Sequence, residues 1–379
     1  MSQSFLWPRR AVLSAAAAAV LGFAVPVHAA DDKPVSKKPK VEVVFCLDTT
    51  GSMGGLIEGA KAKIWSICNQ IASGKPTPDL KVGLVAFRDR GDEYITKVFD
   101  LSDDLDAIHG HLKTFKAAGG GDIPESVNQA LDDAVNKVKW STDNSTLRII
   151  FLVGDAPPHM DYPDDVKYPV TCKKAAERGI IINTIQCGTD ADCTKFWKDI
   201  CVKAEGSFVQ IPQDGGVRQV VSTPFDKRLA EINGDLARTT IVYGKAEEQA
   251  RGLAKNKDAE GLAPGAAAER VAYQAKNAQS ATYDLIDAVK QNRVKLEEMK
   301  DEELPKELQK LKPEERKEYL KKIEEKRETM RKEALELDKQ RSDFITKKQA
   351  EESTKGKSSF DTQVLEVLRN QAKKHKIDY

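Results

Sequence analysis

Residues 41–53 read VEVVFCLDTTGSM, and this stretch decides the fold. Its first seven residues form an apolar run of strand length, which only Glu42 interrupts. A strand that is apolar along its whole length is typical of a parallel sheet covered by helices on both faces. The polar loop that follows is then expected at the carboxyl edge of the sheet, where open α/β folds bind their ligands.

The same alternation of apolar strands and amphipathic segments continues beyond this stretch. Further strands are expected at residues 80–87, 95–101 and 147–153. Helical spacing of apolar residues is found at residues 56–71, 105–115 and 124–138, the last entered through Pro124. Two more helix and strand units end near Ile211. This order predicts a doubly wound, mostly parallel α/β domain over residues 41–222.

The composition changes after residue 222. Residues 223–379 are dominated by Lys, Glu, Ala, Gln and Leu, and they contain no Trp and no Cys. A long helix is expected from Glu314 to Glu351, and its apolar stripe is thin. We therefore predict a charged helical tail, partly coiled-coil-like, that forms a solvated arm or an antiparallel hairpin held by Glu/Lys pairs four residues apart. Self-association through the tail is the alternative.

The N-terminus has the pattern of an export signal. Arg9 and Arg10 precede an apolar run over residues 11–25, and small residues follow up to Ala29. We predict a signal peptide over residues 1–29, a linker over 30–40, and a periplasmic or secreted protein. The run is short for a span of about 20 residues, so no integral membrane segment is expected after cleavage, with an uncleaved anchor as the alternative. The general secretory and twin-arginine routes both remain open.

Six cysteines all lie in the α/β segment, and no two are spaced as C-x-x-C. An even number of cysteines in an exported chain permits disulfides. We expect one or two bridges among Cys172, Cys187, Cys193 and Cys201. The formal net charge is +1, which provides no electrostatic reason to expect a nucleic-acid partner.

Three loops carry the oxygen-bearing side chains of a candidate metal site. Asp48, Thr50 and Ser52 alternate in the first loop, directly after a strand. Asp122 lies in the second loop before a predicted helix, and Asp155 follows the strand at 147–153. Carboxylates that converge repel one another unless a cation lies between them. This set of oxygens suits Mg²⁺, with Ca²⁺ or Mn²⁺ as alternatives, although the hydroxyls of the first loop are also typical helix caps.

These motifs resemble the metal-ion-dependent adhesion site of von Willebrand factor A domains. That family has an Asp-x-Ser-x-Ser loop, a Thr in a second loop and an Asp in a third. Asp48, Thr50 and Ser52 match the first loop, and Asp155 matches the third. Asp122 stands in the region of the second-loop Thr, which is a departure. The resemblance covers residues 41–222, and the extra carboxylate implies a site that holds its ion more tightly and depends less on an acidic partner.

The resemblance implies a binding module that recognises a protein ligand through the metal ion. Two other interpretations are a structural spacer or oligomerisation protein dominated by the tail, and a metal-assisted hydrolase. The sequence shows no Ser-His-Asp order, no phosphate-binding glycine loop followed by Lys, and no H-E-x-x-H motif. We therefore expect no catalytic residues and no enzymatic activity.

Overall fold

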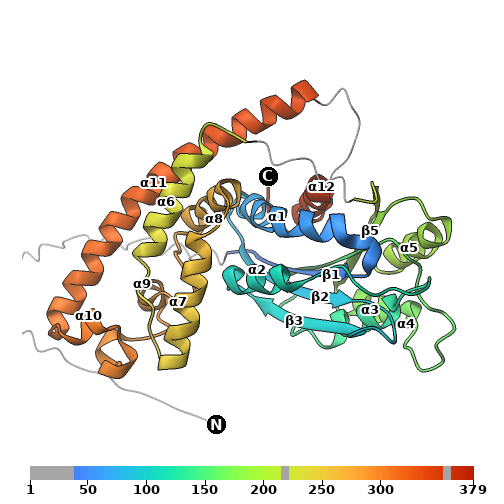
Figure 1. Ribbon diagram of the computed structural model, residues 1–379, viewed down its shortest axis with the longest axis horizontal. Coiled ribbons are helices and arrows are strands. Elements are labelled where there is room, and N and C mark those ends of the chain that lie inside the picture. Colours follow the sequence, from blue (N-terminus) through green and yellow to red (C-terminus); the bar gives the residue numbers. More distant parts are fainter. Residues whose placement is uncertain (1–37, 215–221, 353–359) are drawn as a thin grey trace, which may run out of the picture. The chain divides into compact units, whose positions relative to one another are not determined.

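The computed structural model describes residues 38–214, 222–352 and 360–379. The predicted signal peptide lies outside these residues. A six-stranded sheet of order β3-β2-β1-β4-β5-β6 forms the centre of the first part (Figure 1). The strands are β1 (Lys40–Asp48), β2 (Asp79–Phe87), β3 (Thr96–Ser102), β4 (Leu147–Gly154), β5 (Ile180–Cys187) and β6 (Phe208–Ile211). All neighbouring strands are parallel except β2 and β3, which confirms the predicted mostly parallel sheet.

Helices cover both faces of this sheet, because successive side chains of the central strands point in opposite directions. The helices of the sheet domain are α1 (Gly54–Ile71), α2 (Leu105–Thr114), α3 (Val127–Asn136), α4 (Tyr168–Glu177) and α5 (Ala191–Lys203). Val43 and Phe45 of β1 pack into one buried core with α1 and α2. Val44 and Cys46 pack into a second core with α3, α4 and α5. The apolar run at residues 41–47 is therefore buried on both sides.

The last helix of the chain, α12 (Phe360–Ala372), belongs to the sheet domain. Val364 and Leu368 are fully buried in the core that contains Phe45. Gln371 of α12 and Asn183 of β5 exchange two hydrogen bonds of 3.1 and 2.8 Å. Residues on both sides of the helical region therefore build one core, and a division at residue 222 leaves this helix on the wrong side. A short 3-10 turn, η5 (Lys373–His375), follows it.

The helical region between them, residues 222–352, has cores of its own. Its helices are α6 (Asp226–Arg238), α7 (Ala246–Glu260), α8 (Pro264–Asn277), α9 (Leu285–Lys290), α10 (Lys306–Gln309) and α11 (Pro313–Glu352), with the 3-10 turns η2 (Leu296–Glu298) and η3 (Asp301–Glu303). Leu229 and Ile232 pack with Val271 and Ala334 in one buried cluster. A second cluster contains Leu285, Leu304, Leu308 and Leu320, near the N-terminal end of α11. The helix expected at Glu314–Glu351 is confirmed as α11, but the expectation of a solvated arm is wrong because α11 packs into these cores.

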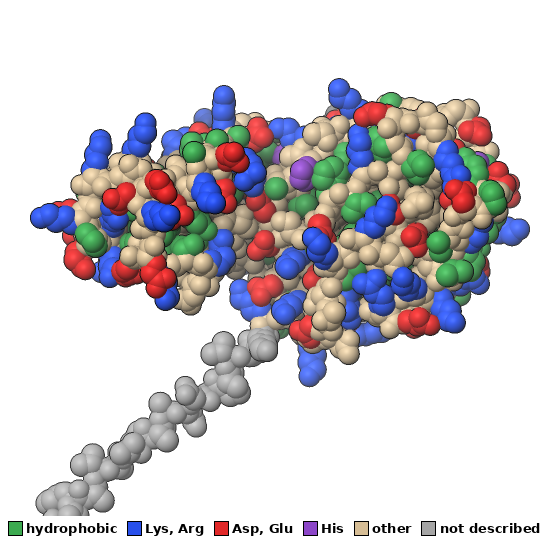
Figure 2. All heavy atoms as spheres, turned by 90° about the horizontal axis from the view of Figure 1, so that it is seen from below, with side chains coloured by type: hydrophobic (Ala, Val, Ile, Leu, Met, Phe, Trp, Pro, Cys, Tyr) green, Lys and Arg blue, Asp and Glu red, His purple; other side chains and the backbone are tan. Residues whose placement is uncertain are grey.

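The buried stripe of α11 is charged rather than apolar. Arg327 is fully buried and donates to both carboxylate oxygens of the equally buried Asp284, at 2.9 and 2.7 Å. Arg341 donates to Asp226 at 2.7 Å and to Glu269 at 2.5 Å. These ion pairs attach α11 to three other helices of the region. On the exposed face seen in Figure 2, Lys and Arg side chains are interspersed with Asp and Glu, as is usual for solvated helices.

The helical region is joined to the sheet domain by polar contacts with α1 and α2. Lys276 of α8 donates to the Asn69 side chain at 2.7 Å, and Asn69 donates to Glu269 at 2.7 Å. Arg270 of α8 donates twice to Asp106 of α2, at 2.8 and 2.7 Å. These contacts lie on the C-terminal half of α1 and on α2, which leaves the N-terminal end of α1 to the loops that follow the strands.

The ion pair of Asp106 and Arg270 is expected to make stability depend on pH. Burial alone would raise the pKa of Asp106, but the adjacent Arg270 guanidinium and its hydrogen bonds lower it below the ordinary 3.8. An acid whose pKa is lowered on folding stabilises the native state above its unfolded pKa, and this contribution is lost as pH falls through the folded pKa. Urea denaturation from about pH 6 to about pH 3 is expected to show a smaller loss of stability for Asp106→Asn than for wild type.

The control for this experiment is Asp343→Asn, because Asp343 is an exposed acid of α11. That variant is expected to lose stability with falling pH in parallel with wild type. An Asp106→Asn curve that ran parallel to both would contradict the assignment.

All six cysteines are buried free thiols. The expected bridges among Cys172, Cys187, Cys193 and Cys201 are therefore wrong for this structure. Cys172 and Cys193 instead fill space in the core under α3, α4 and α5, where burial raises their pKa values above the ordinary range. In the described part of the chain, none of the helices combines the length and the apolar composition needed to cross a bilayer.

Candidate functional site

The first predicted loop is built around a buried carboxylate. Asp48 ends β1 with only 1% of its surface exposed. Its Oδ1 accepts hydrogen bonds from the backbone N–H of Thr50 at 2.8 Å and from the Thr50 hydroxyl at 2.6 Å. Its Oδ2 is buried without a hydrogen-bond partner. The Thr50 hydroxyl also lies 3.4 Å from the Ser52 hydroxyl, so the three predicted residues of this loop form one group.

Close backbone packing holds this loop in place. The chain turns through η1 (Gly51–Met53) directly into α1, and the Gly51 N–H donates to the Gly119 carbonyl at 3.1 Å. A Cβ atom at Gly154, the last residue of β4, would lie 2.9 Å from the Asp48 Cβ. Only glycine therefore fits beside Asp48 at that position. The parallel pairing of β1 with β4 thus brings the first and third loops together.

The second loop contributes Glu125 rather than Asp122. Glu125 is 3% exposed, and its Oε2 is buried without a hydrogen-bond partner. A Cβ atom at Gly120 would lie 2.9 Å from both Glu125 Oε1 and Thr50 Cβ, so this glycine packs between them. Asp122 is exposed, and its charge helps to raise the pKa of the Tyr162 hydroxyl. The structure does not bring Asp122 into the group.

A shifted helix start explains this difference. The sequence places the beginning of the third helix at Pro124, which makes Asp122 the acid just before it. In the structure α3 begins at Val127 with Ser126 as its N-cap, so Glu125 is the acid before the helix. The signal that could have identified it is Ser126, a residue type typical of helix N-caps, followed by the apolar Val127 that starts the helix.

Electrostatics couple the three loops. Burial raises the pKa of Asp48 from 3.8 to about 7, against the hydrogen bonds from Thr50, and the charge of Asp155 raises it further. Burial and the charges of Asp48 and Asp89 raise the pKa of Glu125 to about 9. Asp155 follows β4 and accepts a hydrogen bond of 2.5 Å from Gln213. Negative charge is therefore concentrated at this edge, and the repulsion and burial of these carboxylates lower the stability of the folded protein.

Behind Glu125 lies a buried hydrogen-bonded network that the sequence pattern did not predict. Asp89 accepts hydrogen bonds from the Ser126 hydroxyl at 2.7 Å and from the Tyr162 hydroxyl at 2.8 Å. The His159 Nε2 lies 3.3 Å from the same carboxylate, and the His159 ring stacks on Tyr162. The network fastens the loop after β4 to the loop before α3, and it thereby fixes the position of Glu125.

The donor set fits a hard cation only when its hydroxyls are included. Within residues 38–214, 222–352 and 360–379, no three Asp, Glu, His or Cys side chains converge closely enough to hold an ion by themselves. The expected trio of Asp48, Asp122 and Asp155 is therefore not assembled. What the structure assembles is the Asp48 carboxylate with two hydroxyls, near Asp155 and Glu125, with two buried carboxylate oxygens that lack partners.

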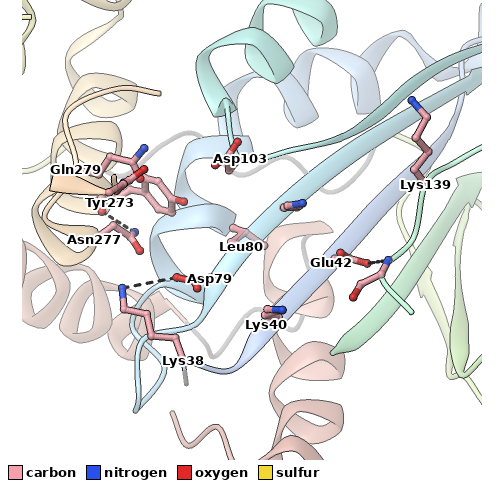
Figure 3. A pocket seen from close by; sticks show the side chains of 13 residues that line it. Lys38, Lys40, Glu42, Asp79, Leu80, Asp103, Lys139, Tyr273, Asn277 and Gln279 are labelled. Carbon is pink, nitrogen blue, oxygen red and sulfur yellow. Dashed lines mark hydrogen bonds and ion pairs between the residues drawn. The ribbon is translucent and has the colours of Figure 1, made fainter. Parts of the chain in front are cut away.

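A cavity lies at the opposite edge of the sheet. It measures about 610 Å³ and is lined by residues at the amino ends of β1 and β2 together with Tyr273 of α8. Lysines gather there, but Figure 3 shows Lys38 directed at Asp79. Lys40 lies 3.4 Å from Asp143, and Lys139 lies 3.2 Å from Asp100. Because these charges are compensated, the cavity is not the candidate site.

Comparison with known proteins identifies the class of the sheet domain. The family model of the von Willebrand factor A domain matches residues 42–188. The chain therefore contains a von Willebrand factor A domain, in agreement with the mostly parallel sheet. Domains of this family are commonly protein-interaction modules.

Related proteins match about a third of the chain. The von Willebrand factor A domain-containing protein 7 of Rattus norvegicus is 37% identical over 120 residues, which is 32% of this chain and 12% of that protein. Its Homo sapiens counterpart is 36% identical over 120 residues, with the same coverage. An ariadne-like RING finger protein of Acanthamoeba polyphaga mimivirus is 27% identical over 119 residues, 31% of this chain and 11% of that protein. The chain thus spans only about an eighth of the length of these relatives.

Solved structures resemble part of the chain. A conserved hypothetical protein, BatB from Bacteroides thetaiotaomicron, has 17% identity and a TM-score of 0.36, and covers 45% of this chain and 90% of its own. The SpRpn10 von Willebrand factor A domain has 15% identity and a TM-score of 0.36, with coverage of 46% and 88%. Proximal thread matrix protein 1 from the mussel byssus, with a zinc-occupied metal-site motif, has 17% identity and a TM-score of 0.36, with coverage of 47% and 43%.

Proposed function

We propose that the chain is an exported interaction module whose von Willebrand factor A domain binds a protein partner with the help of a divalent cation. The ion would be held by Asp48, Thr50, Ser52 and Asp155, with Glu125 in the role expected of Asp122. The observation that carries this proposal is the pair of buried, unpartnered oxygens, Oδ2 of Asp48 and Oε2 of Glu125. Buried carboxylates without partners cost free energy that a bound cation would offset.

Oxygen donors of this kind suit Mg²⁺, and Ca²⁺ or Mn²⁺ are the alternatives. The ion would supply a positive charge to which a partner oxygen can bind. The residues of the chain would orient that charge: Thr50 and Ser52 present hydroxyls from the turn before α1, while the glycines at 51 and 154 let the loops approach. Nothing in this arrangement assigns a nucleophile or a general base, so we propose binding rather than catalysis, with metal-assisted hydrolysis as the weaker alternative.

The alternative of a spacer or oligomerisation arm has less support from the packing. The apolar side chains of α6, α8 and α11 are buried against one another, and α8 is attached to α1. A region that uses its apolar residues internally has fewer left for a second copy. We propose that the helical region braces the sheet domain.

Export belongs to the proposal as well, through the signal peptide expected at residues 1–29. Expression of the full chain in a bacterial host, followed by fractionation and N-terminal sequencing, checks it. The mature protein is expected in the periplasm or medium, beginning at Ala30. Recovery of the intact N-terminus in the cytoplasm would contradict export.

Titration calorimetry of the chain with Mg²⁺, Mn²⁺ and Ca²⁺ tests the metal site. Saturable binding with one ion per chain is expected, as is capture of a partner from an envelope extract that EDTA abolishes. Absence of binding by all three ions would refute metal dependence.

The two acids of the second loop are expected to behave differently. Glu125→Gln removes a buried carboxyl group beside Thr50 that could ionise to bind the metal, and it is expected to weaken Mg²⁺ binding about tenfold to a hundredfold. Asp122→Asn changes an exposed side chain and is expected to alter the affinity less than twofold. Both are measured by calorimetry in the same buffer. The reverse ranking would restore Asp122 as the site residue.

A further inference from the structure

The loops at the carboxyl edge of the sheet are strongly acidic at their surface. Exposed acids stand in the loops after β2, before α3, after β4 and at the start of α5. They are Glu93, Asp122, Asp161, Asp164, Asp190 and Asp192. The exposed basic side chains in or beside these loops are Lys97, Lys116 and Lys195, so acids outnumber bases at this edge. Three of the acids already have a basic neighbour: Glu93 lies 3.0 Å from Lys97, Asp161 2.8 Å from His159 and Asp164 2.9 Å from Arg90. One divalent cation would compensate only part of this charge.

The basic side chains that do lie at this edge are already engaged. Arg90 is one-third exposed and bonds Asp164 at 2.9 Å and Asp165 at 2.7 Å. Lys167 donates to the carbonyl of Tyr162. Arg88 is buried and donates to the carbonyls of Thr49 and Lys116. These cations hold the loops together and do not face a partner.

Apolar side chains are exposed between the acids. Ile123 is 72% exposed beside Asp122, Met160 is 40% exposed beside Asp161, and Val166 is 45% exposed in the same loop. Large apolar side chains that project from an acidic rim are typical of a protein-binding surface. The helical region packs on the far half of α1, around Asn69, so it contacts a different part of the domain (Figure 1).

A second observation points to a ligand at this edge: the buried oxygens of Asp48 and Glu125, which have no partner at the base of the same loops. A partner that approached with a carboxylate would meet the acids of the rim, and like charges brought together at an interface suppress binding. A cationic partner would meet the complementary charges of Asp122, Asp190 and Asp192, the exposed acids of the rim that lie outside these ion pairs. At the opposite, amino-terminal edge lysines and acids are mixed and pair with one another, as Lys38 does with Asp79.

We propose that the carboxyl edge of the sheet domain binds a basic protein segment, rich in lysine or arginine and containing apolar side chains. The proposal rests on the proposed role as an interaction module and names the chemistry of its partner. The basic side chains would face the acids of the rim, and the apolar ones would cover Ile123, Met160 and Val166. A bound ion would draw an oxygen, such as a backbone carbonyl, from the same segment.

Two fluorescent peptides of equal length and equal leucine content test this, one with lysine and one with glutamate at its polar positions. Anisotropy titrations use the full chain, with Mg²⁺ and with EDTA. The lysine peptide is expected to bind at least tenfold more tightly than the glutamate peptide, with an affinity that falls as salt is raised. Equal affinities, or a preference for the glutamate peptide, would overturn the proposal.

Matched charge reversals locate the surface. D122K/D192K is expected to weaken binding of the lysine peptide at least tenfold. The control E260K/E307K makes the same change in net charge at exposed acids of the helical region and is expected to alter binding less than twofold. Equal losses in both variants would mean a diffuse attraction and would also overturn the proposal.

The outcome is separable from that of the proposed metal site. Calorimetry that shows Mg²⁺ binding while the two peptides bind alike would reject the basic partner and keep the metal site. A lysine preference that persists in EDTA, with no Mg²⁺ binding, would do the opposite. A second copy of the chain could also occupy this surface, and sedimentation of the chain at low salt tests for it. Concentration-dependent self-association that the lysine peptide blocks would identify a second copy as the partner and refute a separate basic segment.

Discussion

Arg327→Met is expected to lower the free energy of unfolding by about 3–5 kcal/mol, the usual result of removing one partner of a buried ion pair. The substitution preserves most of the side-chain volume but leaves Asp284 fully buried without its guanidinium. Asp284 would keep only its hydrogen bonds from the backbone of Ile241 and Asp287. Circular dichroism in increasing urea measures the change.

Two further variants separate charge from packing. Asp284→Asn in the Arg327→Met background removes the stranded charge and is expected to recover part of the loss. Lys332→Met alters an exposed pair on the same helix, because Lys332 and Glu328 are mostly solvated at 3.6 Å. It is expected to change stability by no more than about 0.5 kcal/mol. Similar losses for Arg327→Met and Lys332→Met would show that the buried pair does not hold the region together.

Asp48→Asn is expected to weaken Mg²⁺ binding at least a hundredfold and to have opposite effects on stability with and without the ion. In EDTA the amide removes a buried charge that lies near Glu125 and Asp155, so the melting temperature should be equal to wild type or higher. With Mg²⁺ at a hundred times its Kd, wild type should gain about 2.7 kcal/mol, and the variant should gain almost nothing. Thermal denaturation in both buffers checks this.

Asp192→Asn is the matched control, since Asp192 is an exposed acid in the first turn of α5 at the same edge. It should keep the full stabilisation by Mg²⁺. A wild-type protein that melts at the same temperature in Mg²⁺ and EDTA would remove the basis of the metal site. An Asp48→Asn variant that is strongly destabilised in EDTA would mean that the carboxylate is structural.

The sheet domain was predictable because its signals are local and strong. An apolar strand that runs straight into Asp48 fixes both the buried sheet and the edge at which the loop lies. The second loop was less predictable because its outcome depended on where α3 begins. A shift of the start from Pro124 to Val127 exchanged Asp122 for Glu125. The start of a helix depends both on its capping residue and on how the helix packs in the fold. A capping residue can be recognised in the sequence, whereas the packing cannot.

The packing of the helical region escaped prediction for a different reason. Arg327, Arg331, Ala334 and Arg341 recur at the spacing of a buried helix seam. An arginine in such a seam looks solvated unless its partner is known, and the partners lie far away in the chain, at Asp284 and Asp226. Free cysteines were mispredicted because an even count permits bridges but does not place sulfur atoms together.

The position of α12 affects the order in which the parts of the chain can reach their native structure. Within residues 222–352, α11 returns to helices far back in the chain, where Arg341 pairs with Asp226 and Glu269. The core beneath α1 stays incomplete until Leu368 returns to it across the whole helical region. Closing so long a loop is entropically costly and slow. During synthesis, the core on one face of the sheet would therefore remain incomplete until α12 emerges from the ribosome.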